Sequence, residues 1–273
     1  MKLTFLGTGT STGVPQIGCR CVVCTSKDPR DRRLRCSSLL EVEDETATDG
    51  VRRILIDCGP DFREQMLRID FKPLDAILIT HEHYDHVGGL DDLRPYSIFG
   101  NIVVYGEPYC TEHLRQRIPY CFTPKEKRYP GVPSIDLEDI EPGGTVEMGQ
   151  VVVKAIRVMH GKMPILGFLF SRKDEAECSV PFLAYITDMK TIADEVVEQL
   201  HGIPTLVVNG LRHEPHPSHQ TIEEAVAFSQ RLGSPETYLI HMSHHIRPHA
   251  IEDAALPEHV HLAYDGQVVK WEI

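Results

Sequence analysis

Short apolar runs alternate with polar, glycine-rich stretches along most of the 273 residues. Runs of about four to eight residues that are rich in valine, isoleucine and leucine are typical of buried strands. The expected strands cover residues 2–6, 36–42, 52–56, 76–79, 102–105, 151–158, 165–170, 182–186, 205–208, 237–240, 259–263 and 267–272. Helical spacing of apolar positions is found over residues 60–69, 108–120, 192–200 and from Ser218 or Thr221 to Arg231. These elements are those of an α/β protein.

The last two predicted strands, 259–263 and 267–272, are separated by Asp265-Gly266. This dipeptide between two apolar runs is a signal for a β-hairpin. No internal repeat, low-complexity tract or linker divides the chain. A chain of this length can form one large α/β domain or two small ones, and we expect residues 1–273 to form a single domain.

The charge balance favours a small substrate over nucleic acid. The chain carries 28 Lys and Arg against 40 Asp and Glu, a net charge of −12. Proteins that grip long nucleic acids usually show a basic surface, so a nucleic-acid partner is not expected. The apolar part of the N-terminal segment is too short for a signal peptide, and no run approaches the ~20 apolar residues that span a bilayer. We therefore expect a cytoplasmic protein without a membrane partner, whose eight cysteines are thiols or metal ligands.

The segment Thr80 to His86, with the sequence THEHYDH, holds three imidazoles and two carboxylates. It follows the predicted strand 76–79 and precedes residues 87–93, which read as a turn into a helix. A strand end that leads into a loop dense in ligand residues is a natural place for a metal site. Mixed nitrogen and oxygen ligands suit zinc, manganese or iron.

A second candidate metal site lies in the long loop after the first strand. Cys19, Cys21 and Cys24 form a C-x-C-x-x-C cluster. Three thiolates provide most of a tetrahedral zinc shell, so the fourth ligand must come from elsewhere in the chain. The arginine-rich run 30–35 follows; it could hold a phosphate, but such a run is more often a solvated face.

Apolar strands repeatedly end in a histidine or an aspartate. A single residue of this kind is usually structural, but the repetition suggests that one edge of the fold collects ligands for one site. Asp57 could orient a ligand histidine, or it could be an ordinary turn residue. The strand-end residues are Asp57, His81, His160, Asp188 and His241.

The motif H-x-H-x-D-H, followed along the chain by a histidine, an aspartate and a final histidine, resembles the metallo-β-lactamase superfamily. The resemblance extends from residue 2 to residue 272 and implies a four-layer αββα sandwich with a dinuclear site at one edge. A bridging carboxylate argues against antibiotic hydrolysis. The implied ligands are His81, His83 and His160 for one metal, Asp85, His86 and His241 for the other, and Asp188 as the bridge.

The cysteine cluster resembles that of the PhnP-like branch of this superfamily, the phosphoribosyl 1,2-cyclic phosphate phosphodiesterases. In that branch the three cysteines and a histidine three residues after the last active-site histidine bind a structural zinc. Here that histidine is His244, although His245 competes on sequence alone. The branch also implies a histidine as general acid. His219 matches because it directly precedes a helix, with His213 and His216 as alternatives.

The resemblance implies hydrolysis of a small, cyclic phosphodiester, such as 5-phosphoribosyl 1,2-cyclic phosphate. A metal-bridging hydroxide would attack phosphorus, with Asp85 and Asp188 holding the metals and His219 protonating the departing oxygen. The expected cofactors are two divalent metals, zinc or manganese or iron, and one structural zinc. A homodimer is the default assembly.

Two other functions are compatible with the same motifs. One is an RNA-processing nuclease of the superfamily, which the net charge disfavours. The other is a non-catalytic binding protein that resembles the pyrroloquinoline quinone biosynthesis member, which carries the same cysteine cluster. Loops 43–50 and 123–133 look longer than a PhnP-like enzyme needs. Since such loops shape pockets, they leave the substrate open.

Overall fold

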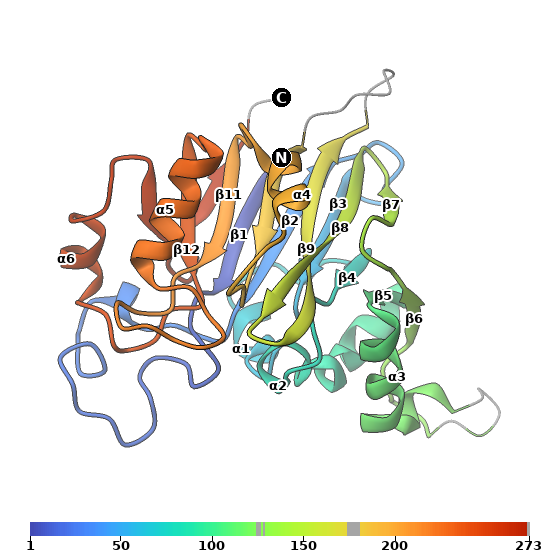
Figure 1. The fold of residues 1–273 in the computed structure, drawn as a ribbon. Coiled ribbons are helices and arrows are strands. Elements are labelled where there is room, and N and C mark those ends of the chain that lie inside the picture. The colour runs from blue at the N-terminus through green and yellow to red at the C-terminus, as the bar shows by residue number, and fades with distance from the viewer. Residues whose placement is uncertain (124–126, 128, 174–180, 272–273) are drawn as a thin grey trace.

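A computed structural model describes residues 1–123, 127, 129–173 and 181–271 of the chain. Two seven-stranded sheets face each other (Figure 1). The first has the strand order β14-β1-β2-β3-β4-β5-β6, with β1 Lys2–Gly7, β2 Ser37–Glu43, β3 Val51–Ile56, β4 Ala76–Leu78, β5 Ile102–Gly106, β6 Ile135–Asp139 and β14 Val268–Lys270. The second has the order β13-β12-β11-β10-β9-β8-β7, with β7 Thr145–Met148, β8 Val151–His160, β9 Met163–Arg172, β10 Pro181–Ile186, β11 Thr205–Asn209, β12 Glu236–Ile240 and β13 Val260–Leu262.

Helices cover the outer face of each sheet, so the predicted four-layer αββα fold is confirmed. Beside the first sheet lie α1 Phe62–Met66, α2 Tyr84–Val87, η2 Leu90–Phe99, α3 Pro108–Arg117 and η3 Pro119–Phe122. Beside the second lie α4 Asp194–Val197, η5 Glu198–Leu200, α5 Ile222–Leu232 and α6 His249–Asp253, while η1 Pro29–Asp31 belongs to the long N-terminal loop. Among the described residues, no helix is long and apolar enough to cross a bilayer.

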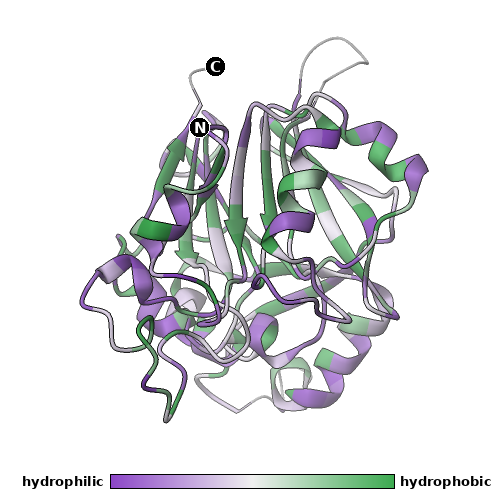
Figure 2. Ribbon diagram, turned by 60° about the vertical axis from the view of Figure 1, so that its left-hand side comes forward, coloured by the Kyte–Doolittle hydropathy of each residue, from purple (hydrophilic) through white to green (hydrophobic). Residues whose placement is uncertain are grey.

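The main core lies between the sheets, where inward side chains of both are fully buried. Phe5 and Ile54 come from the first sheet and Phe168 and Tyr185 from the second. Two further apolar clusters fill the spaces between each sheet and its helices. Apolar side chains therefore dominate the strands, and Figure 2 shows the apolar colour concentrated there.

Strand direction explains why ligand residues gather at one edge. Strands β3 to β6 run parallel to one another, and so do β10 to β13. The carboxyl ends of parallel strands meet at the same edge of a sheet, and the two such edges face each other here. A hydrogen bond from Leu166 N to Thr80 O (3.0 Å) joins the sheets beside the His81 loop.

The predicted C-terminal hairpin is wrong. Strand β13 pairs with β12 in the second sheet, whereas β14 pairs with β1 in the first. The turn residues are correct, because Gly266 adopts φ 90°, but the carboxylate of Asp265 accepts hydrogen bonds from the backbone of Thr8 and Leu34. The chain therefore crosses between the sheets at this point and completes one edge of each.

Most predicted strands are present, and several helices are shorter than expected. The predicted helix 60–69 is reduced to α1, and the predicted helix 108–120 is divided between α3 and η3. Loop 43–50 is the turn between β2 and β3, tied down by the Asp44–Arg52 ion pair at 2.7 Å. Part of loop 123–133 lies outside the described residues.

Candidate metal centre

Three strand-end residues adopt left-handed backbone conformations. Asp57 follows β3 with φ 59°, Asp188 follows β10 with φ 54°, and His241 follows β12 with φ 58°. They are the only non-glycine residues with positive φ in the described part of the chain. Such conformations cost about 1 kcal/mol or more each and are concentrated at functional sites. The local bend turns each side chain toward the edge where the two sheets meet.

His81, His83 and His160 form the first group of donors. Their ligand atoms lie within 4.8 Å of one another, and His81 Nε2 is 3.0 Å from His83 Nδ1. His160 Nδ1 lies 2.8 Å from the carbonyl oxygen of Asp188, to which it donates, so Nε2 remains available as a ligand. His81 is fully buried, which lowers its pKa and keeps the ring neutral, the form that binds a metal. His83 is exposed and marks the open side of the group.

Asp85, His86, Asp188 and His241 form the second group, again with ligand atoms within 4.8 Å of one another. Asp188 lies between the two groups. Its Oδ1 is 2.9 Å from His241 Nδ1 and 3.5 Å from His86 Nε2, while its Oδ2 is 3.9 Å from His81 Nε2. A carboxylate with one oxygen toward each group has the arrangement of a bridging ligand.

Glycine allows Asp85 to reach this position. A Cβ on Gly59 would lie 2.0 Å from the backbone oxygen of Asp85. The α2 loop therefore packs directly on the end of β3, held by a 2.7 Å hydrogen bond from Cys58 N to His86 O. Any larger residue at position 59 would displace Asp85 and His86.

The chemistry of the donor set fits two divalent cations. His86 Nε2 and His241 Nδ1 are buried and make no hydrogen bond within the described residues, although carboxylate oxygens lie near them. Burial opposes charge on Asp188, but the neighbouring His241 and His86 outweigh it and hold its pKa well below the usual range. Buried nitrogens without a hydrogen-bond partner beside an ionised carboxylate are what a mixed nitrogen and oxygen metal site requires.

Asp57 supports two of the candidate ligand histidines. Its carboxylate accepts hydrogen bonds from His86 Nδ1 at 2.7 Å and from the backbone nitrogen of Thr80 at 2.8 Å. The Thr80 hydroxyl lies 2.9 Å from the same carboxylate and 3.0 Å from His81 Nδ1. Both rings are thereby oriented with Nε2 toward the site, so the structure favours the orienting role for Asp57.

Of the three candidate acids, the structure places His219 at the site. Its Nε2 lies 3.2 Å from Asp188 Oδ2, and its Nδ1 lies 3.0 Å from His216 Nδ1. Burial lowers the pKa of His219 to about 4. His213 lies apart from the site, with its nitrogens 2.6 Å from Glu223 and 2.9 Å from Glu252.

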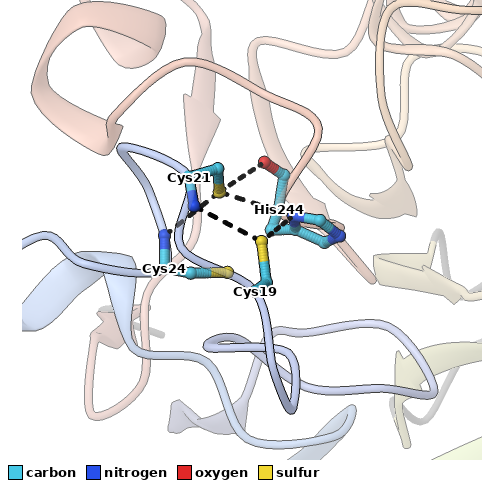
Figure 3. A group of neighbouring side chains, drawn as sticks. All are labelled: Cys19, Cys21, Cys24 and His244. Carbon is cyan, nitrogen blue, oxygen red and sulfur yellow. Dashed lines mark hydrogen bonds between the residues drawn. The ribbon is translucent and has the colours of Figure 1, made fainter.

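The cysteine cluster forms a compact second site (Figure 3). The ligand atoms of Cys19, Cys21, Cys24 and His244 lie within 4.8 Å of one another. His244 Nδ1 is 3.3 Å from Cys19 Sγ and 3.5 Å from Cys21 Sγ, whereas the neighbouring His245 is exposed. Burial works to raise the pKa of Cys21, but hydrogen bonds from Cys24 N and His244 lower it to about 6. These donors match a tetrahedral zinc shell.

Comparison with known proteins agrees with this geometry. Residues 52–242 match the family described as the β-lactamase superfamily domain. This protein belongs to the metallo-β-lactamase superfamily. A crystal structure of a diphosphatase of the PhnP family is 35% identical, with a TM-score of 0.85, over 100% of this chain and 98% of that one. This superfamily member also shares its fold with zinc-bound PqqB from Methylobacterium extorquens, at 19% identity and a TM-score of 0.79 over 99% and 100% of the two chains.

A longer relative carries a different name. A Porphyromonas gingivalis protein named octanoyltransferase is 44% identical over 267 residues, which are 97% of this chain and 51% of that protein. This superfamily member therefore spans about half the length of that curated relative.

Sequence reasoning missed two residues that support the site of this superfamily member. Thr80 links Asp57 to His81, and the buried Asn209 at the end of β11 holds both the backbone nitrogen of Met189 (2.7 Å) and its oxygen (3.0 Å). Asn209 thereby fixes the bend at Asp188. Its position at the end of an apolar run was the available signal.

The interpretation of the arginine-rich run as a phosphate site or a solvated face is wrong for Arg33. Its side chain is 1% exposed and donates to Thr8 Oγ1 (2.9 Å) and to the carbonyl oxygen of Ala263 (2.6 Å). Arg33 therefore ties the N-terminal loop to the second sheet. Both of these hydrogen bonds start from Nη1, whereas the buried Nε has no hydrogen-bond partner within the described residues.

Proposed function

We propose that this protein is a dinuclear metal-dependent hydrolase that cleaves a small phosphodiester. The observation that carries the proposal is the position of Asp188, whose two carboxylate oxygens face the two histidine groups. The 35% identical diphosphatase of the PhnP family supports phosphoryl chemistry. The cations would be zinc or manganese, or iron, because these accept imidazole and carboxylate together.

Each group of side chains would hold one cation. When bound, two divalent cations lower the pKa of a water molecule and neutralise charge that develops on the phosphoryl oxygens. The donors would be His81, His83 and His160 for one ion, Asp85, His86 and His241 for the other, and Asp188 for both. The cysteine cluster with His244 would hold a structural zinc.

The chain's own residues fix this arrangement before a substrate enters. Asp57 and Thr80 hold two imidazoles with Nε2 directed inward, so little reorganisation is needed on binding. His219 is buried beside Asp188, and its low pKa keeps it neutral in the absence of substrate. A phosphoryl anion at the site would raise that pKa, because opposite charge favours the protonated ring. His219 would then donate its proton to the departing oxygen.

A cyclic phosphodiester of a sugar phosphate is the first candidate substrate. The net charge of −12 disfavours a long nucleic acid and therefore the RNA-processing alternative. A substrate with a P–O–P linkage is the second candidate, because the 35% identical relative is a diphosphatase. The complete donor set argues against a purely non-catalytic binding protein. We also propose a cytoplasmic location, where thiolates such as that of Cys21 stay reduced.

Metal analysis and a substrate panel test this proposal together. Three metals per chain are expected, two that exchange with a chelator and one that is held tightly; a single metal would refute the dinuclear site. The panel contains ribose cyclic phosphates, nucleoside 2′,3′-cyclic phosphates, a diphosphate-linked sugar and an octanoyl thioester. Turnover of a cyclic phosphate or of the diphosphate supports phosphoryl hydrolysis and separates the two candidates. Turnover of the thioester alone would contradict both.

A further inference from the structure

The imidazole of His219 is held from two opposite sides. Its Nε2 lies 3.2 Å from Asp188 Oδ2, and its Nδ1 lies 3.0 Å from His216 Nδ1. The Ser218 hydroxyl lies 3.2 Å from both Nδ1 atoms, so it can hydrogen-bond to either ring. Within the described residues, His216 makes hydrogen bonds only to Ser218 and His219. All polar contacts of His216 are therefore directed toward the segment that carries His219.

Packing fixes the plane of the His219 ring but not its orientation within that plane. The ring stacks on His241 with a centroid distance of 4.9 Å and an angle of 18°, and it meets the His160 ring at 4.5 Å and 71°. A rotation of 180° about the Cβ–Cγ bond exchanges Nδ1 with Cδ2 and Nε2 with Cε1, while the ring fills the same space. Hydrogen bonds at the nitrogens must therefore select the orientation that directs Nε2 toward Asp188.

The hydrogen bond to Asp188 is not available for this selection when the metal centre is loaded. In the proposed function Asp188 bridges two cations, so its oxygens are then engaged as ligands. His216 belongs to none of the groups of donor side chains around the site. Its contact with Nδ1 therefore does not compete with metal binding, and it can hold the His219 ring in the loaded protein.

The loop that carries His216 is anchored beside the metal centre. Gln220 N donates to the carbonyl oxygen of Met189 (3.0 Å), and His160 Nδ1 lies 2.9 Å from the carbonyl oxygen of Ser218. His216 also stands between two prolines, residues 215 and 217. Proline fixes its own φ and restricts the residue before it. The backbone therefore presents His216 to His219 with little conformational freedom left to lose.

We propose that His216 is a positioning residue for His219. By hydrogen bonding at Nδ1, it holds Nε2 toward the place where the leaving oxygen departs. Whichever of the two facing nitrogens carries the hydrogen, the contact occupies Nδ1 and leaves Nε2 for the reaction. The inference rests on the proposed role of His219 as the acid in phosphodiester cleavage. It assigns His216 no contact with the substrate.

The dependence of the rate on the leaving group tests this role. His216→Ala should slow the opening of a ribose cyclic phosphate by about tenfold or more, because the departing alkoxide needs a proton. Hydrolysis of bis-p-nitrophenyl phosphate should change by less than about twofold, because p-nitrophenolate leaves without one. His216→Asn should recover most of the loss, since its amide places a hydrogen-bonding atom near the position of Nδ1. His201→Ala is the matched control, because His201 is exposed and outside the donor groups.

A second measurement does not depend on the reaction. In metal-free protein labelled with ¹⁵N-histidine, the Nδ1 signal of His219 is assigned with His219→Gln. It should shift in His216→Ala and return toward its wild-type position in His216→Asn, with the metal content of the loaded protein unchanged in both. The proposal is overturned if this signal does not move, or if His216→Ala slows both esters equally. If the wild type cleaves neither ester, the hydrolase function fails, while the Nδ1 signal still decides whether His216 holds the ring.

Discussion

The strand-end site and the cysteine cluster obtain their donors in opposite ways. Three of the four donors of the cysteine cluster, Cys19 to Cys24, come from one irregular loop. The strand-end site takes its donors from the ends of β4, β8, β10 and β12, which belong to two different sheets. Its histidines are also oriented by buried partners such as Asp57, whereas the three sulfur atoms accept hydrogen bonds from backbone nitrogens of their own loop.

The difference shows what holds the donor side chains of each site in place. Paired strands and a packed core hold the strand-end donors, so this site is largely formed by the fold itself. The loop from residue 8 to residue 36 contains little regular structure, so a bound cation would itself contribute to its folding. The two sites are also connected by one short segment, which carries both His241 and His244. Within this segment, Met242 forms backbone hydrogen bonds with Thr8 and Thr10.

Replacing Asp188 should have the largest effect and should separate the two sites most clearly. Asp188→Asn keeps the size of the side chain but removes the charge that would bridge the two cations. We expect hydrolysis of a chromogenic phosphodiester to fall about a thousandfold, with the tightly held metal retained. Unchanged turnover would move the function elsewhere in the molecule.

Replacing a cysteine should have the opposite effect: it should lower the metal content and the stability but leave the turnover per strand-end metal unchanged. Cys24→Ser should remove one metal per chain and lower the melting temperature by roughly 5–10 °C, since a structural cation contributes several kcal/mol. The ratio of turnover to strand-end metal content should stay close to wild type. Cys110→Ala serves as control, because Cys110 is buried in α3 outside the cluster and should leave the metal content unchanged. A full metal content in Cys24→Ser would reject the cluster as a binding site.

Replacing Asp57 tests whether the orientation of the histidine rings matters for metal binding at the strand-end site. Asp57→Asn replaces the carboxylate that accepts from His86 and Thr80. Metal affinity at this site should fall about 10- to 100-fold, as with other partners that orient ligands. Titration with a competing chelator measures the loss, and the cysteine cluster should keep its metal. Equal loss from both sites would instead indicate general unfolding.

The smallest effect concerns Glu252 on α6, whose carboxylate contacts Arg247 and His213. Burial opposes ionisation of Glu252, but hydrogen bonds from Arg247 and His213 outweigh it and lower its pKa to about 2. The resulting stability is present above pH ~4.5 and is lost as the pH falls through about 2. His213 behaves in the opposite sense: burial lowers its pKa, yet Glu223 and Glu252 raise it overall, so its contribution is fully present below pH ~6.5 and is lost as the pH rises through the raised pKa of the folded protein.

Glu252→Gln should therefore reduce the free energy of unfolding by about 1–2 kcal/mol. The difference from wild type should be widest between pH ~4.5 and ~6.5. Urea unfolding at several pH values measures this. A difference that does not vary between pH 4.5 and 8 would show that the His213–Glu252 pair has no electrostatic role.

The strands and the candidate donors were visible as local features, and the resemblance to the metallo-β-lactamase superfamily implied from them the four-layer fold and the assignment of donors to two metals. Apolar runs of strand length and a dense histidine motif are visible without knowledge of contacts. The four ligands His81 to His86 share one loop, and His160, Asp188 and His241 each end an apolar run. The structure brings these seven side chains together, while their role as metal ligands stays a prediction.

Other features depend on packing that spacing does not encode. His244 and His245 are equivalent in sequence, and only the direction of the chain after β12 turns His244 toward the cysteines. Among His213, His216 and His219, carboxylates on α5 and α6 hold His213 away from the site. The C-terminal strands were misassigned as a hairpin because a turn dipeptide does not specify which sheet each flanking strand joins.

The pairing of β1 with β14 determines where another domain or a tag can be attached to this protein. Lys2 lies opposite Lys270, and the N-terminal amine lies 3.3 Å from the carbonyl oxygen of Trp271, so both ends of the described chain leave from one place. That place is at the start of β1, at the opposite end of the sheets from α2 and the metal centre (Figure 1). A protein domain or affinity tag joined at either end would leave the mouth of the site open, and the two ends could be linked in a circular permutant.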